Sequence, residues 1–321
     1  MNNTRVAILR GGPSDEYSVS MRTGQSVLNA LRHKDIYAKD IVVTKNREWL
    51  EDGKNRDENS VFTGIDVVFI AMHGSFSEDG EIQKILQRNK IPFTGSSSLS
   101  SAIAFNKALT KDILSKQGIL TPKYKLVSKE SLDVRELIKE IRAEFDSEYI
   151  IKPVSNGSSI GTILVKNPDL LERSLEEAFN YSDNLMIEEF IRGREVTSAV
   201  LEDFRDKEIY AFPAVEIITP RESPFYTYEA KYSGKTEFVC PSNFSYRERD
   251  QIANISEQVH RILNLSQYSR SDFIVRDKKI YFLEVNTLPG LTKESIYPKA
   301  AKAVGLEFED LIEHLLNTAT C

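Results

Sequence analysis

RSDFIVRDKKIYFLEVN, residues 270–286, contains two apolar-rich runs on either side of a short polar turn. Two such runs with a polar connection are typical of an antiparallel hairpin. We expect Arg276 to pair with Ile280, with residues 277–279 as the turn between them. The sequence therefore predicts a pair of hydrogen-bonded strands in this region.

The ends of these strands that lie away from the turn carry polar side chains. With the expected register, Asp272 lies opposite Glu284. Two residues further from the turn, Arg270 lies opposite Asn286. Side chains alternate between the two faces of a strand, so all four groups point to one side of the sheet. Two carboxylates and an amide offer hard oxygen ligands, which suit Mg²⁺ bound together with phosphate groups.

Length and composition limit the classes of protein to consider. A chain of 321 residues is longer than one hydrophobic core usually organises, so two or three domains are expected. The net charge is −6 and the basic residues are scattered, which does not favour a nucleic-acid partner. Cys240 and Cys321 give no disulfide framework and favour a reducing cytoplasm. No apolar run reaches membrane-spanning length, so we expect no membrane partner.

The N-terminal part of the chain alternates strand and helix patterns. Buried strands are expected at residues 6–9 and 65–71, and an amphipathic helix pattern follows each of them. Strands that alternate with helices indicate a parallel sheet covered on both faces. Ligands of such sheets bind at the carboxyl ends of the strands, where Glu16 and His73 lie. These two residues are therefore candidates for a binding site.

A second hairpin is expected from residues 149–153 and 162–165. Its connection, residues 154–161, contains two glycines and three serines. Backbone N–H groups of such a loop can surround phosphate oxygens, because glycine allows close approach. Lys152 precedes the loop and adds a positive charge that could neutralise phosphate. The loop is not a P-loop, since a strand pattern follows it instead of Gly-Lys-Ser/Thr and a helix.

Two adjacent acids, Glu188 and Glu189, end another apolar strand pattern. Neighbouring residues of a strand point to opposite faces. One carboxylate can therefore be buried towards a ligand while the other stays in solvent. Further along, apolar residues at helical spacing predict a long amphipathic helix through residues 252–262.

The motifs occur in an order that resembles a known family. They are Gly11-Gly12 with Glu16, His73-Gly74 with Glu78-Asp79-Gly80, Lys152-Pro153 with the 157–161 loop, Glu188-Glu189 with Glu195, Tyr228-Glu229-Ala230-Lys231-Tyr232, Arg270 with Asp272, and Glu284 with Asn286 and Gly290. From residue 5 to about 315, the chain resembles the D-alanine–D-alanine ligases of the ATP-grasp superfamily. The resemblance implies an α/β fold with a three-domain ATP-grasp architecture. An N-terminal parallel α/β domain would span residues 1–95, and two α+β domains, 96–184 and 185–321, would sandwich ATP.

The resemblance also implies a nucleotide site and a metal site. The residues expected to bind ATP are Lys107, Lys152, Ser159, Glu188, Glu189, Ile191 and Glu195. Glu188 would accept a hydrogen bond from the adenine amino group, and Glu195 would hold the ribose. The expected metal ligands are Asp272, Glu284 and Asn286, holding two Mg²⁺ ions, with Mn²⁺ as a substitute. These are the oxygen ligands that the hairpin pattern brings together.

The reaction implied by the resemblance joins two D-alanine molecules for peptidoglycan precursor synthesis. ATP phosphorylates one D-alanine carboxylate, and the amine of a second D-alanine attacks the acyl phosphate. The residues expected to be catalytic are Glu16, Ser158, Tyr232, Arg270, Gly290 and Ser295. Those expected to bind the amino-acid substrates are Glu16, His73, Lys231, Ser295 and Ile296. A cytoplasmic homodimer is expected on the same basis.

Three other interpretations remain. The nearest is an ATP-grasp ligase that joins D-alanine to another acceptor, such as D-serine. A nucleotide-binding regulator without catalysis would be expected to lack part of the polar set at 270–286, which is complete here. A nicotinamide-dependent enzyme is suggested only weakly by the strand and Gly11-Gly12, because Gly-x-Gly-x-x-Gly is absent.

Overall fold

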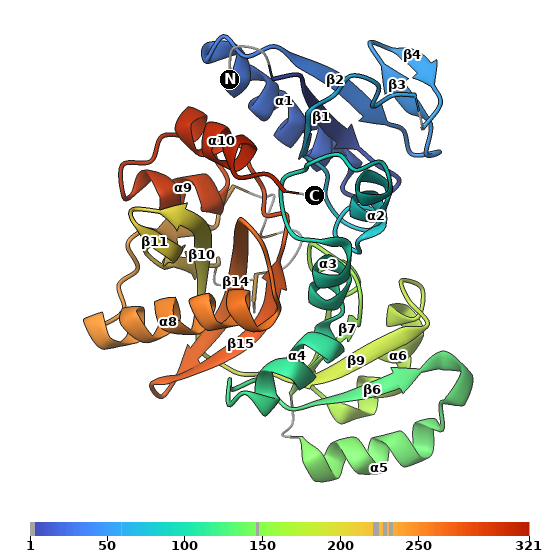
Figure 1. Cartoon of the computed structure of the whole chain (residues 1–321). Coiled ribbons are helices and arrows are strands. Elements are labelled where there is room, and N and C mark those ends of the chain that lie inside the picture. Colours follow the sequence, from blue (N-terminus) through green and yellow to red (C-terminus); the bar gives the residue numbers. More distant parts are fainter. Residues whose placement is uncertain are drawn as a thin grey trace.

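The computed structural model describes residues 4–58, 60–145, 148–220, 225–226, 230 and 234–320. The chain forms three β-sheets, each with helices packed against it (Figure 1). The sheets follow one another along the sequence, so the expected succession of α/β units is present.

The first sheet has five strands in the order β4-β3-β2-β1-β5. Its strands and helices are β1 (Val6–Gly11), α1 (Tyr17–His33), β2 (Ala38–Val43), β3 (Trp49–Glu51), β4 (Lys54–Arg56), β5 (Val67–Ile70) and α2 (Glu81–Arg88). β1 runs parallel to both β2 and β5, which confirms the predicted parallel arrangement. β3 and β4 add an antiparallel edge that the sequence patterns did not indicate.

The second sheet has four strands in the order β6-β9-β7-β8. Its elements are β6 (Tyr124–Ser128), α5 (Val134–Glu144), β7 (Tyr149–Pro153), β8 (Ile163–Val165), α6 (Leu171–Ala178) and β9 (Asn184–Glu189), with short 3₁₀ turns at Lys129–Ser131 and Pro168–Leu170. β7 and β8 pair antiparallel and confirm the predicted hairpin. The loop 154–161 therefore leaves the sheet at the carboxyl end of β7.

The third sheet has six strands, with β13-β12-β10-β14-β15 in order and β11 paired to β10. The strands are β10 (Arg194–Phe204), β11 (Lys207–Ala211), β12 (Val215–Ile218), β13 (Glu237–Val239), β14 (Tyr268–Arg276) and β15 (Lys279–Asn286). α8 (Tyr246–Ile262), the predicted amphipathic helix, packs on it with Ile252 and Val259 fully buried. α3 (Ser98–Phe105) and α4 (Lys107–Lys116) also pack against this sheet, at β15.

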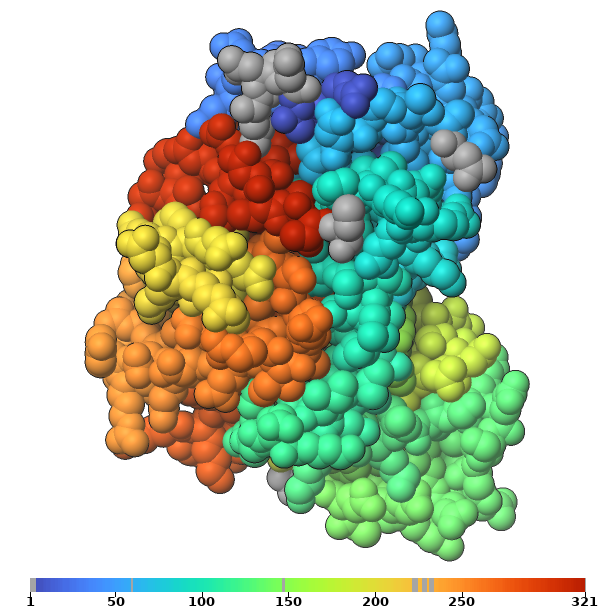
Figure 2. All heavy atoms as spheres, in the orientation of Figure 1, coloured from blue at the N-terminus to red at the C-terminus, as the bar shows by residue number. Residues whose placement is uncertain are grey.

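The last two helices connect the first sheet to the third, since α10 (Phe308–Asn317) contacts α1 and β5 while α9 (Ile296–Lys302) contacts α10 and β10. α9 and α10 share a buried apolar cluster with β1 and β5. Figure 1 shows α10 next to α1, with α9 between α10 and the strands β10 and β11, and Figure 2 shows the red C-terminal segment against the blue N-terminal one. Lys34 at the end of α1 also forms ion pairs with Asp310 and Glu313 of α10. The two ends of the chain are therefore joined in one packed unit.

These contacts bear on the expected domain boundaries. β9 begins at Asn184 and pairs with β6 and β7 of the second sheet. A boundary at 184/185 would cut this strand, whereas a boundary after Glu189 keeps both sheets whole. We therefore propose that the second and third units meet after residue 189. The division into three domains itself remains a proposal.

The turn between β14 and β15 is one residue shorter than expected. Arg276 pairs with Lys279, so the predicted pairing with Ile280 is wrong. The reason is the backbone of Asp277 and Lys278, whose φ angles of 50° and 64° allow a two-residue hairpin turn. The sequence pattern could not distinguish this turn from a three-residue one, because neither position is glycine or asparagine.

A β-bulge restores the predicted pairing of the polar residues. Without it, the shorter turn would place Asp272 opposite Leu283 and send Glu284 to the other face of the sheet. Leu283 is instead an extra residue in β15, so that Phe282 pairs with Phe273 while Glu284 pairs with Asp272. The next polar pair also keeps its predicted register. The bulge thus sets the direction of the two carboxylates.

Among the described residues, no helix combines the length and the apolar character that crossing a membrane requires.

The hairpin turn makes a testable prediction about stability. Replacing Lys278, which holds a left-handed backbone, by glycine should raise the free energy of unfolding by about 0.5–1 kcal/mol, because glycine adopts positive φ without steric cost. Thermal or urea unfolding measures the change. Lys279→Gly is the control, since Lys279 lies in β15 and glycine there should destabilise the strand. Equal destabilisation by both variants would contradict the assigned turn.

Candidate functional site

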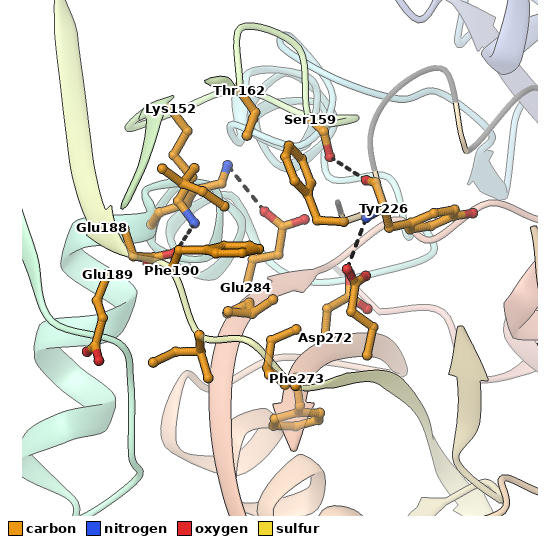
Figure 3. A pocket seen from close by; sticks show the side chains of 18 of the residues that line it. Lys152, Ser159, Thr162, Glu188, Glu189, Phe190, Tyr226, Asp272, Phe273 and Glu284 are labelled. Carbon is orange, nitrogen blue, oxygen red and sulfur yellow. Dashed lines mark hydrogen bonds and ion pairs between the residues drawn. The ribbon is translucent and has the colours of Figure 1, made fainter. Parts of the chain in front are cut away.

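A cavity of about 230 Å³ lies between the second and third sheets (Figure 3). The residues predicted to bind ATP all line it: Lys107, Lys152, Ser159, Glu188, Glu189, Ile191 and Glu195. Asp272 and Glu284 of the predicted metal set line it as well. Apolar side chains, among them Ile150, Phe190 and Leu283, supply much of the remaining wall. Charged groups and an apolar surface therefore share one cavity, as a ligand with a planar ring and anionic groups requires.

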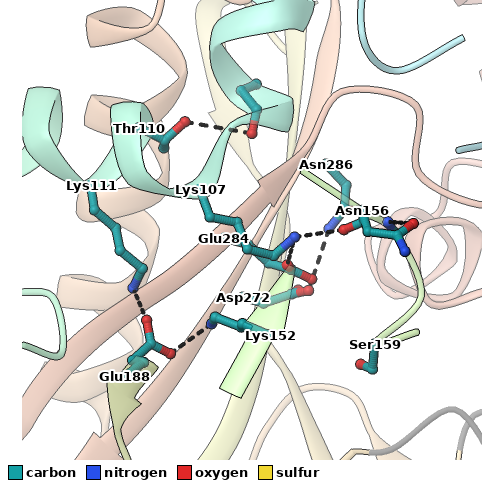
Figure 4. Close-up of polar contacts among 12 residues, drawn as sticks. Lys107, Thr110, Lys111, Lys152, Asn156, Ser159, Glu188, Asp272, Glu284 and Asn286 are labelled. Atoms are coloured by element: carbon teal, nitrogen blue, oxygen red, sulfur yellow. Dashed lines mark hydrogen bonds and ion pairs between the residues drawn. The ribbon is translucent and has the colours of Figure 1, made fainter. Parts of the chain in front are cut away.

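Glu188 joins two lysines at the inner wall of this cavity (Figure 4). Its Oε1 lies 2.6 Å from Nζ of Lys152, and its Oε2 lies 2.7 Å from Nζ of Lys111. Burial opposes ionisation of the Glu188 carboxyl, but the two ammonium groups hold its pKa below the ordinary value. Burial lowers the pKa of Lys111 to about 8, against the attraction of Glu188. The three groups form a buried triad of alternating charge.

The alternation expected for Glu188 and Glu189 is present. Glu188 is only 2% exposed, whereas Glu189 is partly exposed on the other face of β9. Figure 3 shows the two carboxylates pointing in different directions. Glu195, at the start of β10, accepts a hydrogen bond of 3.0 Å from the backbone N–H of Tyr226. Glu195 is thus held at the wall of the cavity by a segment from another part of the chain.

Lys107 connects the carboxylate end of the cavity to the loop 154–161. It is the first residue of α4, and its Nζ lies 3.4 Å from Oε2 of Glu284. The same ammonium donates to the carbonyl of Asn156 at 2.6 Å. Lys107 is mostly buried, so its charge is directed inward. The predicted phosphate lysines, Lys107 and Lys152, therefore both face this cavity.

The predicted metal ligands lie together on the β14–β15 hairpin. Arg270 donates two hydrogen bonds to Asp272, at 3.0 and 2.9 Å, and Asn286 donates to the same carboxylate at 3.4 Å. Thr197 on β10 donates its hydroxyl to Asp272 as well. Burial opposes the charge on Arg270, but Asp272 raises the pKa of the guanidinium further above its ordinary value. Asp272 and Glu284 pair across the hairpin, so their side chains lie on one face of the sheet.

The donor atoms of this set fit a hard divalent cation. Asp272, Glu284 and Asn286 can supply carboxylate and amide oxygens, once the Asn286 side chain presents its oxygen instead of its NH₂ group. In the described residues, no cluster of three or more His, Cys, Asp or Glu could hold a metal by itself. Mg²⁺ needs six oxygen ligands, so the remaining ones would have to come from phosphate and water. The set therefore suits a metal that arrives with a nucleotide.

A second group of predicted residues lies where the first sheet meets the loop 154–161. The Ser158 hydroxyl donates to the carboxylate of Glu16. A Cβ atom on Gly157 would approach Oε2 of Glu16 to 2.6 Å, and one on Gly74 would approach it to 3.0 Å. Two glycines thus allow the backbone to come close to this carboxylate. The fold thus brings together Glu16 and Ser158, two of the predicted catalytic residues, which are 142 residues apart in the sequence.

His73 lies beside this group and is buried. Its Nε2 contacts Oγ1 of Thr23 at 2.8 Å, and its Nδ1 contacts the carbonyl of Leu288 at 3.1 Å. Burial works against protonation, but the Glu78 carboxylate, 3.8 Å from Nδ1, and the charge of Glu16 raise the pKa of His73 above its ordinary value. His73 therefore connects the first sheet to the segment that follows β15.

The remaining predicted residues lie after β15 or outside the described part of the chain. A Cβ on Gly290 would lie 3.1 Å from Oγ of Ser295, so these two residues adjoin each other. Ser295 precedes α9, and Ile296 is its first residue and is buried. Lys231 and Tyr232 lie outside the described residues, so their predicted contacts are not tested.

Lys111 and Thr197 are among the residues that contact the predicted set and that sequence reasoning missed. Lys111 was missed because a lysine in a helix usually faces solvent. Lys111 follows Lys107 by four residues, which places both side chains on one face of α4. This spacing could have indicated that Lys111, like Lys107, faces the interior. Thr197 lies in the middle of a strand, and only the pairing of β10 with β14 places it opposite Asp272.

Comparisons of the sequence with known proteins match one family along most of the chain. Residues 113–317 match the family described as D-ala D-ala ligase C-terminus, and residues 51–96 match D-ala D-ala ligase N-terminus. D-alanine–D-alanine ligase of Geobacter sulfurreducens is 37% identical, covering 99% of this chain and 95% of that protein. The corresponding ligase of Nitrosomonas europaea is 35% identical, with coverage of 97% and 96%.

Solved structures give the same picture. The VanG D-Ala:D-Ser ligase from Enterococcus faecalis superposes with a TM-score of 0.85 at 28% identity, covering 98% of this chain and 99% of that one. The D-alanine–D-alanine ligase from Bacillus anthracis, solved in complex with ATP, gives 0.78 at 27% identity, with coverage of 98% and 96%. The fold is therefore the expected three-part α/β architecture of such ligases.

The close approach at Gly157 leads to a prediction about the loop. Gly157→Ala should expose residues 155–161, because the added Cβ collides with the Glu16 carboxylate 2.6 Å away. Hydrogen exchange of the loop amides should become faster while the three sheets stay protected. Ser155→Ala, in an exposed position of the same loop, serves as the control. Unchanged exchange in Gly157→Ala would mean that this contact does not hold the loop.

Proposed function

This chain belongs to the D-alanine–D-alanine ligase family, and on that premise we propose that it joins two D-alanine molecules and converts ATP to ADP and phosphate. The observation that carries the proposal is the cavity in which lysines and paired carboxylates face an apolar wall. Beside it lies the Glu16–Ser158 contact, which suits the recognition of an amino group. Nucleotide and amino acid would thus meet at the loop 154–161.

ATP would occupy the cavity between the second and third sheets. Lys107 and Lys152 would contact its phosphates, and the loop with Ser159 would close over them. Glu188 would accept from the adenine amino group, Ile191 would meet the ring through its backbone, and Glu189 lies beside it. Glu195 would hold the ribose. Each of these side chains lines the cavity, which is what the assignment requires.

Asp272, Glu284 and Asn286 would hold the metal, two Mg²⁺ ions with Mn²⁺ as a substitute. When bound, Mg²⁺ would shield the negative charge of the transferring phosphoryl group. Arg270 and Lys107, which pair with these carboxylates here, would then be available to oxygen atoms of the substrates. The bulge at Leu283 supports the assignment, since it turns Glu284 to the same face as Asp272.

The two amino-acid sites would lie beside Glu16 and after β15. Glu16 would bind the ammonium of the first D-alanine, with Ser158 and Tyr232 hydrogen-bonded nearby and His73 next to it. The carboxylate of the first D-alanine would take up the γ-phosphoryl group of ATP, and ADP would leave. The deprotonated amine of the second D-alanine would then attack the acyl carbonyl, and phosphate would leave as the amide bond forms. Arg270 and the Gly290 N–H would stabilise the oxyanion that forms, a contribution typically of about 3 kcal/mol. Lys231, Ser295 and Ile296 would hold the second substrate.

The biological setting follows from the reaction. The dipeptide serves peptidoglycan precursor synthesis, and we place the reaction in the cytoplasm, where ATP is made. A homodimer is proposed from the family resemblance alone. Light scattering of the purified chain would test it, and a monomer mass would refute it.

A ligase that joins D-alanine to D-serine is the second candidate. The similarity of the fold to the VanG D-Ala:D-Ser ligase favours it. Against it, the relatives with 34–37% identity over nearly the whole chain are D-alanine–D-alanine ligases. A dipeptide of two D-alanines is therefore the better supported product.

The proposal is tested by measuring phosphate release from ATP and Mg²⁺ with D-alanine, and by the mass of the product. D-Alanine alone should give D-alanyl-D-alanine, whereas L-alanine should give no release. Addition of D-serine or D-lactate in competition shows which nucleophile is preferred. No release with D-alanine, together with a mixed product in the presence of D-serine, would favour the second candidate instead.

The metal assignment makes a separate prediction. Glu284→Gln should lower turnover by about a hundredfold or more, because a neutral amide replaces a charged oxygen at a site where charge stabilisation amounts to several kcal/mol. Steady-state rates over a range of Mg²⁺ concentrations measure the effect. Glu208→Gln, an exposed position on β11, is the matched control. Wild-type turnover of Glu284→Gln at saturating Mg²⁺ would refute the assignment.

A further inference from the structure

Lys111 is a buried ammonium group that the reaction, as derived so far, does not use. Its side chain is 0% exposed and does not line the cavity, unlike Lys107 one helical turn earlier. A lysine is almost never fully buried unless it is paired. Its partner is Glu188, at 2.7 Å, and its Nζ also donates to the carbonyl of Phe282 at 3.3 Å. Lys111 therefore ties α4 to β9 in the second sheet and to β15 in the third.

Lys152 approaches Glu188 from the opposite side and differs from Lys111 in its access to the cavity. Its side chain is 11% exposed, and it lines the cavity wall. Figure 4 shows the two lysines on either side of the Glu188 carboxylate. One ammonium is enclosed by protein, and the other can reach a ligand. The two ion pairs of Glu188 are thus not equivalent.

Anionic phosphates in the cavity would attract Lys152 away from Glu188. A buried carboxylate that loses its cation is strongly unfavourable, because an uncompensated charge stays in a medium of low polarity. Glu188 keeps a cation in that event, since Lys111 remains on its other oxygen. This second partner reduces the energy that the departure of Lys152 requires.

We propose that Lys111 is a positioning residue, which keeps Glu188 ionised and fixed so that Lys152 can move from Glu188 to the phosphates of ATP. The proposal rests on the ATP site of the proposed function. It adds that Lys152 is shared between protein and nucleotide, and that the hydrogen-bond acceptor for the base depends on a lysine outside the cavity.

The variant Lys111→Met tests this with little change in side-chain volume. We expect its KM for ATP to rise roughly ten- to hundredfold, the range for loss of one close contact between charged groups. The kcat at saturating ATP should change much less, because Lys111 does not touch the reacting atoms. Lys116→Met, an exposed lysine of the same helix, removes the same charge and should leave KM unchanged. Equal KM values for both variants would overturn the proposal.

A comparison of ATP with ITP separates positioning from a general loss of structure. ITP carries a 6-oxo acceptor where ATP carries the amino donor, so an ionised Glu188 rejects it. Without Lys111, Glu188 can take up a proton and donate to the 6-oxo group. The preference for ATP over ITP should therefore fall in Lys111→Met. A preference equal to that of the wild type would contradict the role assigned to Lys111.

A double variant covers the case in which Lys111→Met does not fold. Lys111→Met combined with Glu188→Gln removes both buried charges, and it should bind ATP as Glu188→Gln alone does. Further loss beyond the single Glu188→Gln variant would show that Lys111 acts independently of Glu188 and would overturn the proposal. Calorimetric titration with ATP in the absence of D-alanine gives this answer even if no dipeptide is formed. A failure of the ligase assay is thus distinguishable from a failure of this inference.

Discussion

The site depends on the pairing of buried cations with carboxylates across the gap between two sheets. Glu188 belongs to the second sheet, whereas Glu284 and Asp272 belong to the third. Between them stands α4, which packs on β15 and carries the lysines that reach both carboxylate groups. Charges buried in this way are stable only when their partners are close and well oriented. The positions of the two sheets are therefore constrained by electrostatics as well as by apolar packing.

The hairpin shows how far sequence reasoning could go. The apolar pattern of residues 270–286 predicted two strands with Asp272 opposite Glu284, and this pairing is present. The predicted turn was one residue too long, and a bulge in β15 compensates for the difference. The turn type here depends on positive φ angles at two residues that are not glycine, Asp277 and Lys278. A bulge leaves no periodic pattern in the sequence that would reveal it. The pairing of Asp272 with Glu284 was therefore predicted correctly, although it arises from a shorter turn and a bulge instead of the predicted longer turn.

The same distinction applies to the cavity. Lys152 and Glu188 could be identified from the sequence because each belongs to a short motif whose neighbouring residues are also recognisable. Lys111 could not, since its role arises from contacts with β9 and β15, which are far away in the chain. Binary patterns assign a charged residue of a helix to solvent unless a partner is known. The domain boundary shows the same limit, because pairing of β9 with β6 and β7 is a non-local fact.

The loop 154–161 places the two halves of the site under one constraint. The carbonyl of Asn156 accepts a hydrogen bond from Lys107, which faces the cavity between the second and third sheets. Two residues later, the Ser158 hydroxyl donates to Glu16, which belongs to the first sheet. The contact of Ser159 with the carbonyl of Tyr226 adds the segment that also holds Glu195. Because one short loop makes all three contacts, it cannot leave one of them without altering the others. In the proposed reaction, closure of this loop over the nucleotide would therefore also enclose the amino-acid site and keep water from the acyl phosphate.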